Sequence, residues 1–209
     1  MTLALLMPEL ILIAFAILVI VLDLTVKQKD FLRSTSLAGI VIAAGISLMM
    51  LGGDYPAIFN NMLAVDSFAI FFKLLFLGIA FLVILASTDY VSKFERFQGE
   101  YYALVLFSTL GMMLMAATTD LISIYVALEF TGISLYVLVG FLKDAKSSEA
   151  SLKYLLLGAV ASAVMLYGMA LVFGLTGETQ LGKIAQVIQA MSVSPLASPA
   201  LLLGIVLLI

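Results

Sequence analysis

Apolar residues dominate this chain in long uninterrupted stretches, and short polar stretches separate them. A helix needs about 20 residues, each rising about 1.5 Å, to cross a hydrocarbon layer about 30 Å thick. Six apolar stretches reach or approach that length, at about residues 3–24, 35–51, 67–87, 101–117, 120–141 and 148–173. The pattern therefore predicts an all-α, polytopic membrane helix bundle that forms a single membrane domain over residues 1–209.

The chain after the sixth stretch follows a different pattern. Residues 176–199 are mostly polar, and apolar positions recur there at helical spacing, which predicts a short amphipathic helix at about 180–191 in the membrane interface. A seventh apolar run at 199–209 starts with Ser198 and Pro199 as cap and first helical residue. It reaches only about half a bilayer. A chain end there would leave unpaired carbonyls in lipid, so we expect a truncated seventh span and a longer parent protein.

Composition supports the membrane assignment and narrows the chemistry. The chain is 64% hydrophobic and 11% charged, with a mean hydropathy of +1.25, which excludes a soluble domain. The ten Lys and Arg residues are spread over several loops, so no nucleic-acid surface is expected. Because the chain has no Cys and no His, we expect no metal site, iron–sulfur cluster or haem in it. Glycine-rich nucleotide motifs are also absent from the sequence.

The distribution of basic residues predicts the orientation of the chain in the membrane. The loops after spans two, four and six hold one basic residue, Lys183. The loops after spans one, three and five hold seven, namely Lys27, Lys29, Arg33, Lys93, Arg96, Lys143 and Lys146. By the positive-inside rule these loops are cytoplasmic, and the N-terminus lies outside.

One carboxylate, Glu129, lies near the middle of the fifth span. Counted from Asp120 it is roughly 14 Å deep, close to the centre of the hydrocarbon layer. A charge there costs at least about 2.5 kcal/mol, and such residues usually face a bundle interior or a file of water. Glu129 is therefore the leading candidate for proton or ion handling. The alternative is a neutral glutamic acid that hydrogen-bonds to a neighbouring helix as a packing residue.

Two lysines are the other candidates. Lys73 lies about 10 Å inside the third span, which Asp66 is expected to cap, and it either snorkels to the interface or has a function. Lys153 lies about 6 Å inside the sixth span, with Glu149 one turn before it, and it too would snorkel if it acted alone.

The depths of the candidate residues limit how they can interact. Glu129 and Lys153 differ in depth by about 13 Å, so we expect no direct ion pair between them. Proton passage between these two residues would then need bridging water or another titratable group. Glu9, in the first turn of the first span, is explained by the positive end of the helix dipole.

Several sequence blocks carry a family resemblance. They are Pro8-Glu9-Leu10 with Asp23, the run from Glu100 to Leu104, the run from Gly111 to Ala116, Leu128-Glu129, the run from Ser134 to Leu138, Glu149-Ala150-Ser151-Leu152-Lys153-Tyr154, and Leu157-Gly158-Ala159. With these blocks the whole chain resembles the N-terminal part of subunit N of bacterial NADH-quinone oxidoreductase, respiratory complex I, whose mitochondrial counterpart is subunit 2.

The resemblance implies an antiporter-like bundle and a proton path. Glu129 would be the glutamate of span five and Lys153 the lysine of span six. Lys73 and Glu149 are possible auxiliary residues. The family's next lysine, in span seven, would fall just beyond Ile209.

The resemblance also implies a function that depends on partner subunits. The chain would be part of a proton-pumping translocase that couples electron transfer from NADH to quinone with proton movement. NADH, FMN, the iron–sulfur clusters and quinone would be bound by other subunits. The expected partners are the antiporter-like subunit M and the small subunits K, J and A, in the inner membrane of a bacterial cell.

Two alternatives remain open from the sequence. A stand-alone cation/proton antiporter would also carry a carboxylate in mid-membrane, but it would usually show paired broken helices, which spans one to six lack. A structural membrane subunit would tolerate Glu129→Gln, because the amide can still hydrogen-bond.

Overall fold

A computed structural model describes residues 2–25, 30–53, 55–92, 94, 97–190 and 198–208. The described part is helical and contains isolated bridges but no strand. Its elements are η1 (Thr2–Leu6), α1 (Met7–Thr25), α2 (Asp30–Met49), α3 (Ser67–Ala86), α4 (Thr88–Val91), α5 (Gln98–Ala117), α6 (Leu121–Val139), α7 (Ala145–Thr176), α8 (Leu181–Ala190) and α9 (Pro199–Leu208). Six helices within the described ranges are long and apolar enough to cross a membrane, which confirms the predicted class of fold.

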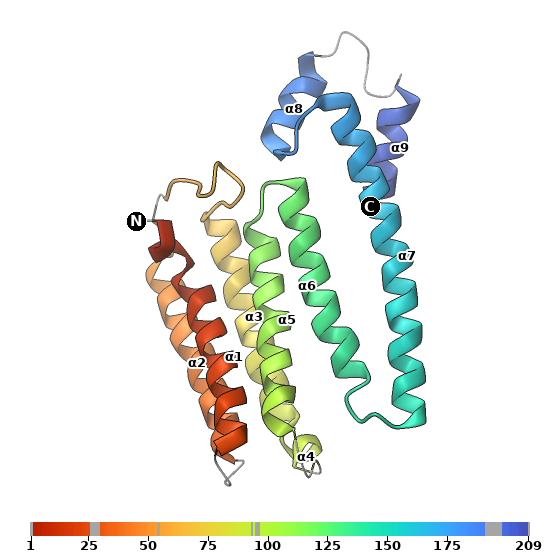
Figure 1. Cartoon of the computed structure of the whole chain (residues 1–209). Coiled ribbons are helices and arrows are strands. Elements are labelled where there is room, and N and C mark those ends of the chain that lie inside the picture. The colour runs from red at the N-terminus through yellow and green to blue at the C-terminus, as the bar shows by residue number, and fades with distance from the viewer. Residues whose placement is uncertain are drawn as a thin grey trace.

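Four helices form a closed group around the main core. Helix α1 packs on α2 and α5, and α3 also packs on α2 and α5, so α1 and α3 lie diagonally opposite each other. Figure 1 shows these helices side by side, with α6 next to α5. The core between them is apolar and includes Leu12, Val19, Leu77, Ile84, Leu106 and Met113. We call α1, α2, α3 and α5 the four-helix group.

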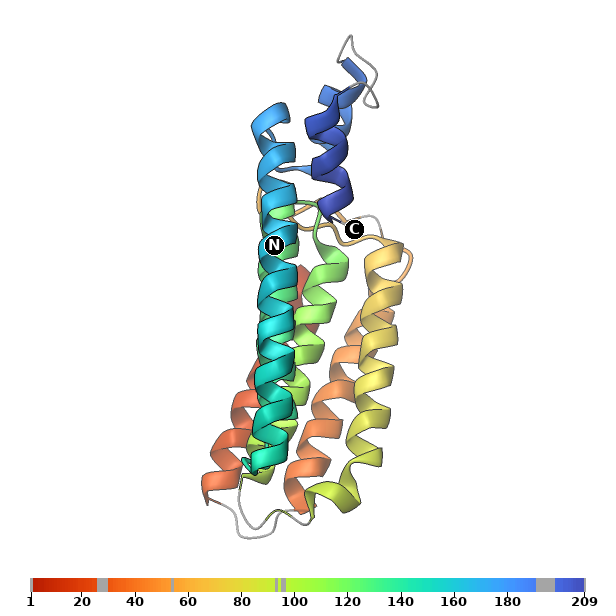
Figure 2. The ribbon, with the colours of Figure 1, turned by 90° about the vertical axis from the view of Figure 1, so that its right-hand side faces the viewer.

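Helix α6 connects the four-helix group to the remaining helices. It packs on α5 at one side and on α7 at the other. Helix α9 packs along α7, as Figure 2 shows, and a second apolar cluster joins α6, α7, α8 and α9. The members of that cluster are Leu121, Met169, Val172, Ile184 and Leu201.

Aspartates cap the first turns of three spans. Asp66 accepts a hydrogen bond from the backbone N–H of Ala69 at 2.8 Å, which confirms the predicted cap of α3. Asp120 caps α6 and Asp144 caps α7 in the same way, because their carboxylates satisfy N–H groups that have no partner within the helix. Asp144 also explains why α7 begins three residues before the start we expected.

The loop at residues 55–66 contacts the ends of several helices. The backbone N–H of Ala64 donates to Ala117 at the end of α5, and Thr119 donates to Met62. The side chain of Gln180 donates to the carbonyl of Asn60 at 2.6 Å. The turn between α5 and α6, which starts the helix that carries Glu129, is therefore held by neighbours from both sides.

Candidate functional site

Glu129 lies in the third turn of α6, the helix between the four-helix group and α7. Its side chain is half-buried. The Oε1 atom is buried and has no hydrogen-bond partner among the described residues. A buried carboxylate oxygen without a partner is costly, so it must be stabilised by water or by protonation. The described part of the chain thus does not supply the packing hydrogen bond that the structural alternative requires.

Close packing between α5 and α6 holds this part of α6 in place. Gly111 of α5 faces Thr131 and the carbonyl of Ala127 on α6, and a Cβ atom at Gly111 would lie 3.1 Å from that carbonyl oxygen. The absence of a side chain at Gly111 therefore lets the two backbones approach, as small residues do between membrane helices. Thr131 is two residues beyond Glu129, so the depth of Glu129 is set by this contact.

Lys153 lies near the start of α7, and its Nζ forms an ion pair with Glu149 one turn earlier. Both side chains are well exposed on the outside of the bundle, by 69% for Lys153 and 64% for Glu149. The described residues contain no ion pair between Lys153 and Glu129, in agreement with their expected difference in depth. The structure therefore brings Lys153 together with Glu149 but keeps it apart from Glu129.

Lys73 is buried in the four-helix group, and the snorkelling interpretation is wrong. Its side chain is 1% exposed, and its Nζ lies 2.6 Å from Oε1 of Glu9 on α1, whose side chain is 3% exposed. Because α1 and α3 lie diagonally opposite each other, this ion pair crosses the inside of the group. The helix dipole alone therefore does not account for Glu9. The sequence pattern did not identify Glu9 as the partner of Lys73.

The Glu9–Lys73 pair is a charge contact rather than a well-formed hydrogen bond. The two atoms touch at 2.6 Å, yet their angles do not meet hydrogen-bond geometry. Among the described residues, neither Glu9 Oε2 nor Lys73 Nζ has another hydrogen-bond partner. Opposite charges this close attract each other strongly at any angle.

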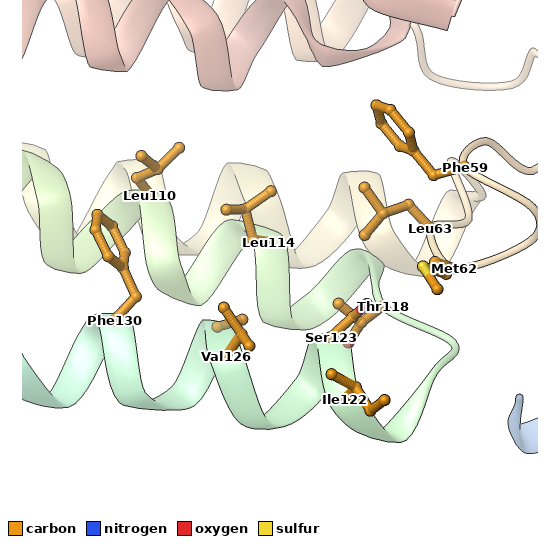
Figure 3. A pocket seen from close by; sticks show the side chains of 11 residues that line it. Phe59, Met62, Leu63, Leu110, Leu114, Thr118, Ile122, Ser123, Val126 and Phe130 are labelled. Atoms are coloured by element: carbon orange, nitrogen blue, oxygen red, sulfur yellow. The ribbon is translucent and has the colours of Figure 1, made fainter. Parts of the chain in front are cut away.

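An apolar groove lies beside α5 and α6 and next to the loop at residues 55–66 (Figure 3). Its volume is about 470 Å³, and its walls include Leu114 of α5, Val126 and Phe130 of α6, and Phe59 of the loop. The only polar side chains in its lining are hydroxyl groups, and Glu129 is not part of it. The groove is thus distinct from the candidate proton-handling site. Nor do three His, Cys, Asp or Glu side chains converge on a metal site in the described ranges.

The fold defines a class of protein, an antiporter-like membrane helix bundle. Residues 118–209 match the family described as NADH:quinone oxidoreductase/Mrp antiporter, TM. The NADH-quinone oxidoreductase subunit N of Dehalococcoides mccartyi is 49% identical over 97% of this chain and 42% of that protein. The chain is a homologue of the N-terminal part of subunit N of NADH-quinone oxidoreductase. It spans about two fifths of the length of the curated relatives it matches.

Two solved structures share the fold. The chain superimposes on respiratory complex I from Thermus thermophilus with bound Aureothin with a TM-score of 0.75 and 31% identity, covering 97% of this chain and 42% of that one. It also resembles the membrane-bound sulfane sulfur reductase, an archaeal respiratory membrane complex, with a TM-score of 0.80 and 25% identity, covering 100% of this chain and 43% of that one.

Proposed function

We propose that this chain forms the N-terminal part of a proton-translocating membrane subunit of NADH-quinone oxidoreductase, with Glu129 as its proton-carrying residue. One observation carries the proposal. A carboxyl group lies near the middle of α6 with a buried oxygen that no described residue satisfies. The homology with subunit N over 97% of the chain supports the same function.

Glu129 would act by alternately holding and releasing a proton. The protonated form is neutral, whereas the ionised form carries a full charge in a medium of low dielectric constant, so a cation that moves nearby shifts the balance between the two forms. A coupling of a few kcal/mol between a distant redox step and such a movement is sufficient. Lys153, at the inner end of α7, would tune the affinity of nearby water for protons through its positive charge.

The partner subunits would supply the redox chemistry of this translocase. NADH, FMN, the iron–sulfur clusters and quinone would bind outside this chain, which would contribute no redox group of its own. Subunit M and the small subunits K, J and A would be its neighbours in the membrane. The similarity to complete respiratory complexes supports a place within such an assembly.

The proposed orientation, with the N-terminus outside a bacterial inner membrane, is supported by charges at the two ends of the molecule. Arg33 lies in the first turn of α2, and Lys143 and Lys146 lie at the start of α7. These two helix starts are at the end opposite the N-terminus, the lower end in Figure 1. Lys183 on α8 lies at the upper end. The other four basic residues of the predicted inner loops, Lys27, Lys29, Lys93 and Arg96, fall outside the described residues.

Glu129→Gln tests the proposal in the full-length subunit assembled with its partners. Glutamine preserves the shape and hydrogen bonding of the side chain but cannot titrate, so we expect less proton pumping at near-normal complex content. Protons moved per electron are measured in liposomes with a trapped pH dye. Glu178→Gln is the matched control, because that carboxylate lies beyond the end of α7, is 36% exposed and pairs with Lys183. Pumping that stays at the wild-type ratio in Glu129→Gln would refute the proposal.

A further inference from the structure

A tyrosine lies between the two proposed path residues at the contact of α6 with α7. Tyr136 follows Glu129 by seven residues on α6, which is two helical turns or about 10.5 Å, so both residues lie on nearly the same side of that helix. Long side chains on a helix lean toward its N-terminus. The phenol group of Tyr136 accordingly points back toward the turn that carries Glu129.

Two glycines form the slot that holds the Tyr136 hydroxyl. A Cβ atom on Gly158 of α7 would overlap this hydroxyl and lie 2.7 Å from Cζ of the ring. A Cβ atom on Gly132 of α6 would lie 3.1 Å from the same hydroxyl oxygen. Gly132 is three residues, or about 4.5 Å of helix, from Glu129. The hydroxyl therefore lies more than half of the way along α6 from the backbone of Tyr136 to Glu129.

The other end of Tyr136 is fixed to the part of α7 that carries Lys153. The hydroxyl of Ser151 donates to the carbonyl oxygen of Tyr136 at 2.8 Å. The rings of Tyr136 and Tyr154 meet edge to face, with centroids 4.8 Å apart. Because Tyr154 directly follows Lys153, the ring of Tyr136 lies at a depth between that of Lys153 and that of Glu129.

A cavity adjoins this slot. Its volume is about 450 Å³, and Tyr136, Gly158 and Leu128 line it together with the buried Ser162 of α7 and residues of α9. Leu128 immediately precedes Glu129. The space is large enough for several water molecules, and two hydroxyl groups are available to bind them.

We propose that the Tyr136 hydroxyl is a relay that passes protons between water at the inner end of α7 and Glu129. The hydroxyl gives its proton to a water or to the carboxylate on the Glu129 side and takes one from a water on the Lys153 side. One O–H bond breaks and one forms at Tyr136, with no change of charge or oxidation state over the cycle. This inference rests on the proposed function of Glu129.

Tyr136→Phe tests the relay in the full-length subunit within its complex, reconstituted in liposomes with a trapped pH dye. Phenylalanine keeps the ring, the slot and the contact with Tyr154, and it removes only the hydroxyl. We expect the pumping rate to fall roughly twofold to tenfold, the factor that one hydrogen bond contributes. Gly158→Ala should also lower it, because its methyl group displaces the hydroxyl.

Tyr154→Phe is the matched control, because it removes the other hydroxyl of the same ring pair and should leave pumping unchanged. Equal losses in Tyr136→Phe and Tyr154→Phe would overturn the relay, since any change in the ring pair would then suffice. Wild-type pumping in Tyr136→Phe, with a defect in Glu129→Gln, would also overturn the relay but leave the proposed function standing. Wild-type pumping in Glu129→Gln would instead refute the proposed function itself.

Discussion

Removal of one member of the Glu9–Lys73 pair leaves the other charge buried inside the four-helix group. The two side chains are 3% and 1% exposed, so water cannot replace the lost partner without opening the bundle. The perturbations we consider are Lys73→Met and Glu9→Leu, each alone and then together. Methionine and leucine are apolar, are roughly similar in volume to the residues that they replace, and suit the surrounding core.

The size of the effect follows from the geometry of the contact. At the observed 2.6 Å and an effective dielectric constant of about 20, the Coulomb attraction is roughly 6 kcal/mol. Most of it offsets the cost of removing both charges from water, so the net contribution of the intact pair is small. A single substitution removes the attraction but keeps the cost of one buried charge, and it should destabilise by about 3–5 kcal/mol. The double substitution removes both, and it should be neutral or stabilising.

The assay is the thermal stability of the purified assembly, together with the amount of subunit in membranes. Each single variant should show a lower Tm and a lower amount, and the double variant should recover both. Lys153→Met with Glu149→Leu is the matched control, because the same charges are exposed there and should matter by only about 0–1 kcal/mol.

One result would refute this reasoning, and another would assign the pair a second role. A double variant no more stable than the worse single variant would show that the two charges do not compensate each other. A double variant that assembles normally but pumps fewer protons would show that the pair takes part in translocation, as an auxiliary role for Lys73 would require.

Three further predictions concern the helix caps and Lys153. Asp120→Ala removes the cap of α6 and the partner of the Thr179 hydroxyl, and it should lower stability by about 0.5–2 kcal/mol in a melting experiment. The backbone N–H of Ser147 donates to Asp144 and holds the pKa of that carboxyl below its usual range. The cap of α7 should therefore persist above about pH 4 and be lost as the pH falls through the lowered pKa. Hydrogen exchange would show this loss. Lys153→Ala should slow proton pumping in liposomes across pH, whereas Lys153→Arg should be milder because it keeps the charge.

Local chemistry explains why part of the fold could be predicted from sequence. The hydropathy pattern identified the six spans because each must bury its whole length in lipid. The cap at Asp66 could be predicted because it depends only on the next three residues. The ends of α7 were less predictable, since Lys146 continues the helix beyond the apolar part, and the helix reaches Ala145–Thr176.

The partner of Lys73 was less predictable, because a one-dimensional pattern gives the depth of a residue but not the direction in which it points. Glu9 and Lys73 are 64 positions apart and lie on helices that do not follow each other in the chain. A clue was nevertheless present. Both helices start at the same side of the membrane, and both charges lie within their first two turns, so a comparison of depths could have suggested the pair.

The two charge systems differ in a way that bears on translocation. Glu9 and Lys73 are paired with each other inside the four-helix group. Glu129 has no such partner among the described residues, and it lies outside the four-helix group on a helix that packs on α7 as well as α5. A change in the packing of α7 would therefore reach Glu129 and Tyr136 directly, whereas the Glu9–Lys73 pair would be shielded by α5. The proposed proton exchange is therefore best placed at the contact of α6 with α7.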